Sequence, residues 1–129
     1  MADQPTRILL AEDDRFLRKA AEASLRRSGY VVVAAADGEE ALRLARSEAP
    51  DLILLDLIMP KLQGFEVLKA LKADAATAGI PVIVLSNLSQ DRDVQQAMEG
   101  GAASYVVKAN LSLKELVKKV QETLRPPAP

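Results

Sequence analysis

Short apolar runs alternate with helix-forming segments about five times along this chain of 129 residues. The runs at residues 7–11, 52–55 and 82–85 show no regular alternation of polar with apolar side chains, and residues 30–33 and 104–107 are two further candidates. Strands buried on both faces have this continuous apolar character, and they occur in parallel sheets that helices cover on both sides. The pattern therefore predicts an α/β fold, a doubly wound parallel sheet of five strands with five helices.

Helix-start and helix-stop residues lie between these runs. We expect helices over residues 14–29, 37–49, 64–71, 89–100 and 112–124. The residues that can cap their first turns are Asp14, Asp37, Ser89 and Ser112. In the first helix, the apolar side chains expected to face the sheet are Phe16, Leu17, Ala20, Ala21 and Leu25.

The length of the chain fits about one domain. We expect a flexible N-terminus at residues 1–6, one domain at residues 7–125, and a tail or linker stub at residues 126–129. The start of the chain has no export pattern, and no apolar run approaches the about 20 residues that span a bilayer. These features favour a cytoplasmic protein without membrane insertion.

Two missing residue types restrict the chemistry. The chain has no cysteine and no histidine, which excludes disulfides, thiolate zinc sites, cysteine nucleophiles and imidazole catalysis. Any metal must be bound by oxygen ligands, which favours Mg²⁺, or Mn²⁺, over zinc. If a phosphohistidine takes part, it belongs to a partner. The 17 basic and 18 acidic residues give a net charge of −1, so we expect no direct binding of nucleic acid.

Polar side chains follow four of the predicted strands. They are Glu12, Asp13 and Asp14 after the first strand, Asp56 after the run at 52–55, Ser86 after the run at 82–85, and Lys108 after the last. The carboxyl ends of parallel strands converge on one crevice, so these groups are expected to lie together. Clustered carboxylates repel one another, and a hard cation relieves that repulsion. The sequence therefore predicts a site for a divalent cation and a phosphoryl group.

Each of these residues also has a simpler structural explanation. The acidic run after the first strand can complement the dipole of the first helix, and for Asp14 a capping role is favoured. Asp56 can be a turn residue, Ser86 a helix-start residue, and Lys108 a surface lysine whose stem covers apolar neighbours. We favour the functional interpretation because all of these groups follow strands that end at the same crevice.

The same residues resemble a known family, the response-regulator receiver domains of the chemotaxis-regulator type. The resemblance covers nearly the whole chain and rests on four segments in order: residues 8–14, residues 51–60 with Gly64, residues 82–86 and residues 101–108. Each segment alone is moderately specific, and the four together are strongly so. The resemblance implies a flavodoxin-like fold with strand order 2-1-3-4-5.

The resemblance also implies a role for each site residue. Asp56 would be the phosphoacceptor, forming an aspartyl phosphate. Asp13 would be a direct Mg²⁺ ligand, Glu12 would act through the water shell of the ion, and the backbone carbonyl of Ile58 would supply a further ligand. The chain would catalyse only its own phosphorylation and dephosphorylation.

Lys108 and Ser86 are expected to bind the phosphoryl oxygens, because phosphoryl transfer depends mainly on positioning and charge stabilisation. By resemblance, Tyr105 is the switch aromatic that turns inward when Ser86 moves toward the phosphoryl group. The donor would be a histidine kinase or a histidine phosphotransfer protein, and the output a downstream protein or a fused domain. The implied partner face is the fourth helix, last strand and last helix, with candidates Arg92, Tyr105, Lys114 and Lys118.

Three other functions are weaker matches. An aspartyl phosphatase wants a second acid two residues after its nucleophile, where Ile58 stands. A flavodoxin-like cofactor binder wants a small polar phosphate loop after the first strand, where three acidic residues stand instead. A degenerate receiver that only binds proteins remains the main alternative.

Departures from the family pattern affect three places. Ala109 replaces the usual proline after Lys108, so the peptide bond there is either trans or a costly non-proline cis bond. Asn87 replaces a small residue in the loop after Ser86. Ile58 and Leu88 are both apolar, and they occupy two positions that in the family flank the path of the attacking water. We therefore expect slow self-dephosphorylation.

Overall fold

The structure, a computed structural model, describes residues 5–88 and 90–124. The expected cap at Ser89, residues 1–4 of the expected N-terminal segment and the expected tail at 126–129 lie outside these ranges. Within them the strands are β1 (Arg7–Ala11), β2 (Val31–Ala35), β3 (Leu52–Asp56), β4 (Val82–Ser86) and β5 (Ser104–Val107). The helices are α1 (Arg15–Arg27), α2 (Gly38–Glu48), α3 (Gly64–Ala73), α4 (Asp91–Glu99) and α5 (Leu113–Leu124), with a 3₁₀ turn, η1, at Lys108–Asn110.

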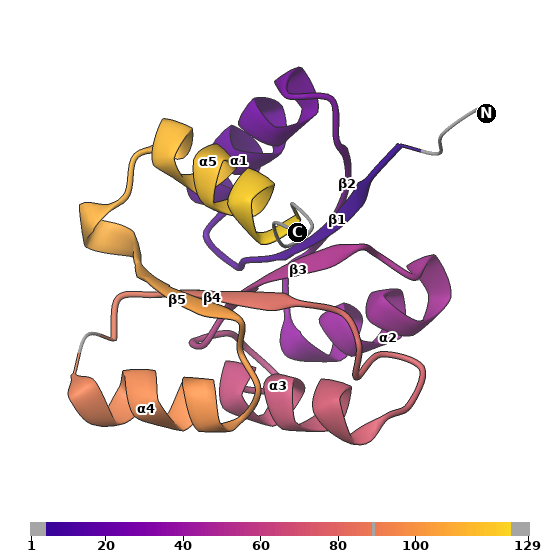
Figure 1. The fold of residues 1–129 in the computed structure, drawn as a ribbon, viewed down its shortest axis with the longest axis vertical. Coiled ribbons are helices and arrows are strands. Elements are labelled where there is room, and N and C mark those ends of the chain that lie inside the picture. Colours follow the sequence, from indigo (N-terminus) through magenta and orange to yellow (C-terminus); the bar gives the residue numbers. More distant parts are fainter. Residues whose placement is uncertain (1–4, 89, 125–129) are drawn as a thin grey trace, which may run out of the picture.

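The strands form one parallel sheet in the order β2-β1-β3-β4-β5. Helices α1 and α5 cover one face, and α2, α3 and α4 cover the other (Figure 1). Every residue of β3 and β4 is buried, as the continuous apolar runs predicted. The doubly wound fold and its strand order are thus confirmed.

The predicted starts of α1 and α2 have side-chain caps. Asp14 Oδ1 accepts the N–H groups of Phe16 and Leu17 at 2.9 and 3.2 Å. Asp37 Oδ1 accepts the N–H of Glu40 at 2.8 Å. These carboxylates satisfy backbone donors that the first turn of a helix leaves without partners. Asp14 therefore has the capping role expected of it.

One expectation about α1 is wrong. Phe16 was expected to face the sheet, but its side chain is 89% exposed. Residues 17, 21 and 25 follow an i, i+4 spacing, and Leu17 takes the inward position of the first turn, where it is half-buried and lines a small cavity together with Leu10, Leu85 and Leu116. Phe16 is consequently left on the outside of the helix.

A strained residue ends α2. Ala49 has φ 45° and ψ 59°, the left-handed conformation that favours glycine. We expect Ala49→Gly to raise the free energy of unfolding by about 0.5–1 kcal/mol, because glycine removes the Cβ clash and loses part of this gain through its more flexible unfolded state. Urea denaturation measures the change. The matched control is Ala23→Gly in the exposed middle of α1, which should lower stability by about as much; a loss of stability in both variants would contradict the explanation.

Candidate functional site

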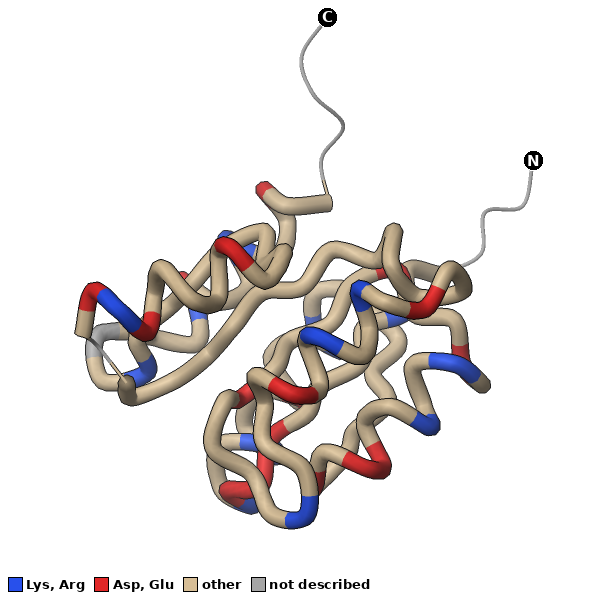
Figure 2. Tube along the Cα trace, turned by 90° about the horizontal axis from the view of Figure 1, so that it is seen from below, with Lys and Arg blue, Asp and Glu red and all other residues tan. Residues whose placement is uncertain are grey.

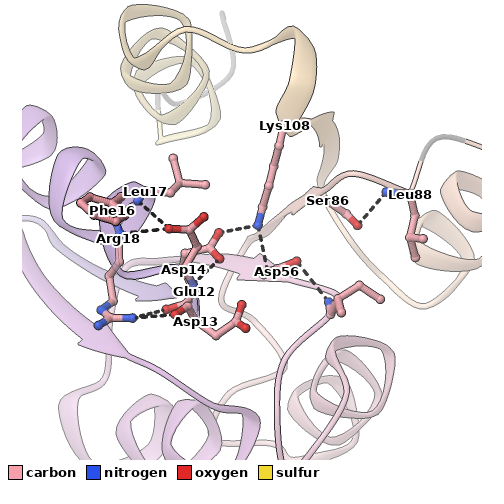
Figure 3. Close-up of polar contacts among 11 residues, drawn as sticks. Glu12, Asp13, Asp14, Phe16, Leu17, Arg18, Asp56, Ser86, Leu88 and Lys108 are labelled. Carbon is pink, nitrogen blue, oxygen red and sulfur yellow. Dashed lines mark hydrogen bonds and ion pairs between the residues drawn. The ribbon is translucent and has the colours of Figure 1, made fainter.

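Three charged side chains from distant parts of the sequence meet at the carboxyl edge of the sheet. Lys108 Nζ lies 2.6 Å from Glu12 Oε1 and 2.9 Å from Asp56 Oδ2 (Figure 3). Glu12 follows β1, Asp56 ends β3, and Lys108 follows β5. The crevice expected from the strand ends therefore brings the ammonium group between two carboxylates.

The loop after Asp56 is folded tightly against its backbone. Gly64 N–H donates to Leu57 O at 2.8 Å, and a Cβ at Gly64 would lie 2.3 Å from Leu57 Cα and 2.5 Å from Asp56 O. Only glycine permits so close an approach. Ile58 N–H donates to Asp56 Oδ1 at 3.1 Å. The two oxygens of Asp56 are therefore held by different partners, the Ile58 N–H and the Lys108 ammonium group.

Glu12 is the most strongly perturbed group. Its side chain is fully buried, and burial raises its pKa to about 7, partly opposed by hydrogen bonding to Lys108 and to the N–H of Asp14. Asp14 N–H donates to Oε2 at 3.0 Å. Oε1 faces the Lys108 ammonium group at 2.6 Å. The buried carboxylate is thus held between a backbone N–H and a cation.

At Lys108 the contacts with charged neighbours, and not burial, decide the direction of the pKa shift. Burial alone would lower its pKa, but the contacts with Glu12 and Asp56 outweigh burial and raise it. Lys108 is therefore a permanent cation at neutral pH, suited to neutralising oxygen anions.

The acidic residues fit a divalent cation. Glu12, Asp13 and Asp56 each offer a carboxylate oxygen, and these three oxygens lie within 4.8 Å of one another. Glu12 and Asp56 are buried and Asp13 is exposed, so the cluster opens to solvent on one side. Carboxylate oxygens with access to water are the donor set that Mg²⁺ prefers.

Ser86 and Tyr105 both bond to one residue of the β4–α4 loop. Leu88 N–H donates to Ser86 Oγ at 3.1 Å, and Tyr105 OH donates to Leu88 O at 2.6 Å. Ser86 is fully buried and Tyr105 half-buried. Since the Ser86 oxygen accepts from Leu88, its own hydrogen can be donated to another group. The pKa of Tyr105 is raised, mainly by burial.

The departures from the family pattern have clear positions. No cis peptide bond occurs within the described residues, so the bond between Lys108 and Ala109 is trans and the chain continues into η1. Asn87 is exposed. Ile58 is 57% exposed and Leu88 is half-buried, so both flanks of the site are apolar.

The predicted partner-face residues lie on more than one surface. Arg92 is exposed on α4, and Lys118 lines a groove with Tyr105. Lys114 lines a second groove, of about 590 Å³, between α1 and α5 together with Arg27 and Lys118, so Lys118 borders both grooves. Figure 2 shows basic and acidic residues interspersed along the described trace.

Sequence reasoning missed one residue that contacts the site. The guanidinium Nη1 of Arg18 donates to the carbonyl oxygens of Glu12 and Asp13 at 2.8 and 3.3 Å. A signal for it exists in the sequence. Helix N-termini disfavour cations, yet Arg15 and Arg18 both lie near the start of α1.

Among the described helices, none has both the length and the apolar character that crossing a bilayer requires.

Known proteins are similar to this chain in sequence and in fold. A family model described as "Response regulator receiver domain" matches residues 8–121. "Probable transcriptional regulator ycf27" of Guillardia theta is 40% identical over 119 residues, covering 92% of this chain and 45% of that protein. The receiver domain of the Francisella response regulator 1452 superposes with a TM-score of 0.86 at 29% identity, covering 92% of this chain and 96% of that one.

Chemotaxis protein CheY4 of Vibrio cholerae also superposes with a TM-score of 0.86 at 29% identity, covering 92% of this chain and 98% of that one. The chain spans about half the length of the curated transcriptional regulators that it matches.

Proposed function

Because this chain belongs to the response regulator receiver domains of two-component signalling, we propose that it accepts a phosphoryl group on Asp56 from the phosphohistidine of a partner. One observation carries the proposal: Asp56 Oδ2 is 2.9 Å from Lys108 Nζ, inside a group of three carboxylates that fits Mg²⁺. A nucleophile, a cation for the phosphoryl oxygens and ligands for a metal are thus present in one crevice.

The transfer is a displacement at phosphorus. A carboxylate oxygen of Asp56 forms the new P–O bond as the P–N bond to the donor imidazole breaks, and the electron pair of that bond stays on the imidazole nitrogen. Lys108 exchanges its contact with Asp56 for one with a phosphoryl oxygen. The Ser86 hydroxyl donates its hydrogen to another phosphoryl oxygen, while its own oxygen still accepts from Leu88.

Mg²⁺, or Mn²⁺ in its place, would neutralise charge on the phosphoryl oxygens when bound. Asp13 and Asp56 would hold it directly, Glu12 through its water shell, and the Ile58 carbonyl would complete the protein ligands. Without the cation, the same carboxylates would repel an incoming phosphate, so phosphorylation should require it.

The β4–α4 loop would carry the signal outward. Ser86 and Tyr105 bond to the N–H and the carbonyl of Leu88, so a movement of Ser86 toward the phosphoryl group displaces a residue that Tyr105 also holds. Phosphorylation would thereby shift the equilibrium between two arrangements of the α4–β5–α5 face. Arg92, Lys114 and Lys118 are exposed cations of that face, and we propose that a partner protein contacts them.

The phosphoryl donor, the location, the domain bounds and the output of the switch are also inferred. We infer a histidine kinase or histidine phosphotransfer protein as donor, a cytoplasmic location, and residues 7–125 as the receiver unit. Matched relatives named transcriptional regulators are about twice as long as this chain, which favours a transcriptional output through a partner protein or a fused domain. A degenerate receiver is disfavoured because this chain has the acidic, hydroxyl and lysine residues at all of the expected site positions.

The direct test is incubation with acetyl phosphate or beryllofluoride, with and without Mg²⁺. We expect mass spectrometry to detect one added phosphoryl group from acetyl phosphate, only when the cation is present. Unmodified protein under both conditions would instead support the phosphorylation-independent binding module.

The lifetime of the aspartyl phosphate is expected to be long. Ile58 is exposed beside the site and cannot orient an attacking water by hydrogen bonding. Replacing it by Asn should accelerate hydrolysis by about tenfold, the effect of about 1.4 kcal/mol on the barrier. Loss of the phosphoryl group followed by mass spectrometry measures the rate, and Ile58→Val is the apolar control. Rapid hydrolysis in the wild type, or no acceleration in Ile58→Asn, would contradict this explanation.

A further inference from the structure

Arg18 is bonded to the backbone of two proposed metal-binding residues. Its Nη1 donates to Glu12 O at 2.8 Å and to Asp13 O at 3.3 Å, and its side chain is half-buried (Figure 3). The arginine lies on α1, so its side chain reaches back over the start of its own helix to the loop that follows β1.

The other polar groups of this loop have different partners. Glu12 N–H donates to Ala35 O at 3.0 Å, and Asp14 N–H donates to Glu12 Oε2 at 3.0 Å. Asp14 O accepts the Arg18 N–H at 2.8 Å. Among the described residues, the guanidinium group is what engages the carbonyls of Glu12 and Asp13. It therefore helps to hold both peptide planes, the second together with the bond from Asp14 N–H to Glu12 Oε2.

The orientation of a peptide plane determines the positions of the two Cα atoms that it joins, and therefore where the side chains on those atoms begin. Glu12 is rigidly buried, but Asp13 is exposed and has no side-chain hydrogen bond within the described residues. The Asp13 carboxylate thus depends on its backbone for its position near Glu12 and Asp56. A charged donor holds a carbonyl more strongly than a neutral one does.

We propose that Arg18 is a positioning residue that preorganises Glu12 and Asp13 for the divalent cation. The proposal rests on the proposed function only in taking Mg²⁺ as the cation. Arg18 does not touch the ligand oxygens themselves. Residues that orient metal ligands typically contribute about 10- to 100-fold to metal affinity.

Isothermal titration calorimetry of metal-free protein with Mg²⁺ alone tests the proposal, without any phosphodonor. Arg18→Met keeps the apolar stem and removes the donors, and we expect its Kd for Mg²⁺ to rise by about 10- to 100-fold. Arg18→Lys retains a charged donor that can reach a single carbonyl, so it should recover part of the lost affinity.

Arg15→Met is the matched control. Arg15 is exposed in the same first turn and has no side-chain hydrogen bond or ion pair within the described residues. Both variants remove one positive charge near the site, so a general effect of charge would weaken both alike. We expect Arg15→Met to stay within about twofold of the wild type at physiological salt, where exposed charges are screened.

Urea denaturation without Mg²⁺ separates positioning from folding. A role limited to stability would lower the denaturation midpoint of Arg18→Met and leave the Kd unchanged, which would overturn the proposal. Equal weakening in Arg15→Met, or no binding of Mg²⁺ by the wild type, would overturn it too. If Arg18→Met does not fold, Arg18→Lys decides, with a Kd raised severalfold supporting the proposal and a wild-type Kd opposing it.

Failure of the proposed function would look different. It would appear as no phosphoryl uptake from acetyl phosphate by wild-type protein that is saturated with Mg²⁺, whatever the Kd values of the Arg18 variants.

Discussion

Replacing Asp56 by asparagine is expected to reduce phosphoryl uptake from acetyl phosphate by more than about 1000-fold, the scale of effect seen when a covalent nucleophile is removed. The amide keeps nearly the same size and can still accept the Ile58 N–H, but it cannot displace a leaving group from phosphorus. Mass spectrometry of intact protein with saturating Mg²⁺ measures the uptake.

The control for Asp56→Asn is Asp91→Asn. Asp91 is an exposed aspartate in the first turn of α4, so its replacement makes the same chemical change away from the crevice. It should leave phosphorylation at the wild-type level. Lys108→Met should slow phosphorylation, but Asp56 should still be the residue that accepts the phosphoryl group. Full modification of Asp56→Asn would show that another residue accepts the phosphoryl group.

The second large effect is a loss of stability of the metal-free protein as the pH rises. Burial raises the pKa of Glu12 from 4.5 to about 7. Between these two values the folded protein keeps a proton that the unfolded chain has lost, so the folded state binds more protons. Unfolding then becomes easier with rising pH. The shift corresponds to about 3 kcal/mol, lost between about pH 4.5 and 7.

The composition makes this effect easy to observe. The chain has no histidine and no cysteine, so few other groups titrate in the same range. Asp37 changes the stability at lower pH and in the opposite direction, because the backbone N–H of Glu40 helps to hold the pKa of Asp37 below its usual value. The slope of stability against pH near neutrality therefore reports mainly on Glu12.

Glu12→Gln should remove that slope. The amide is neutral at every pH, so the variant should be more stable than the wild type above pH 7, by up to about 3 kcal/mol in the absence of metal. Urea denaturation in a chelating buffer from about pH 5 to 8 measures it. Glu66→Gln, at an exposed position of α3, is the control. A wild-type stability that stays level across this range would refute the assignment.

Added Mg²⁺ should offset the same penalty, because a cation beside Glu12 favours its charged form. Glu12→Gln should consequently gain less stability from Mg²⁺ than the wild type does. The acidic cluster thus costs stability in the absence of the cation.

Much of the fold could be predicted because its signals are local. The apolar runs of β3 and β4, the caps at Asp14 and Asp37, and the spacing of α5 each depend on a few neighbouring residues. Phe16 shows the limit of such signals. Its position fits an apolar stripe, but in the folded chain Leu17 lines the cavity beneath the first turn and Phe16 stays outside.

The sequence by itself determined that a carboxylate group, a hydroxyl and an ammonium group follow strands that share one sheet edge. Only the tertiary structure decided which atoms meet. Lys108 pairs with Glu12 and Asp56, Arg18 binds the Glu12 and Asp13 carbonyls, and the peptide bond after Lys108 is trans. The reason is physical: distances between side chains from different strands, and the exclusion of water that raises the pKa of Glu12, arise only when the whole chain packs.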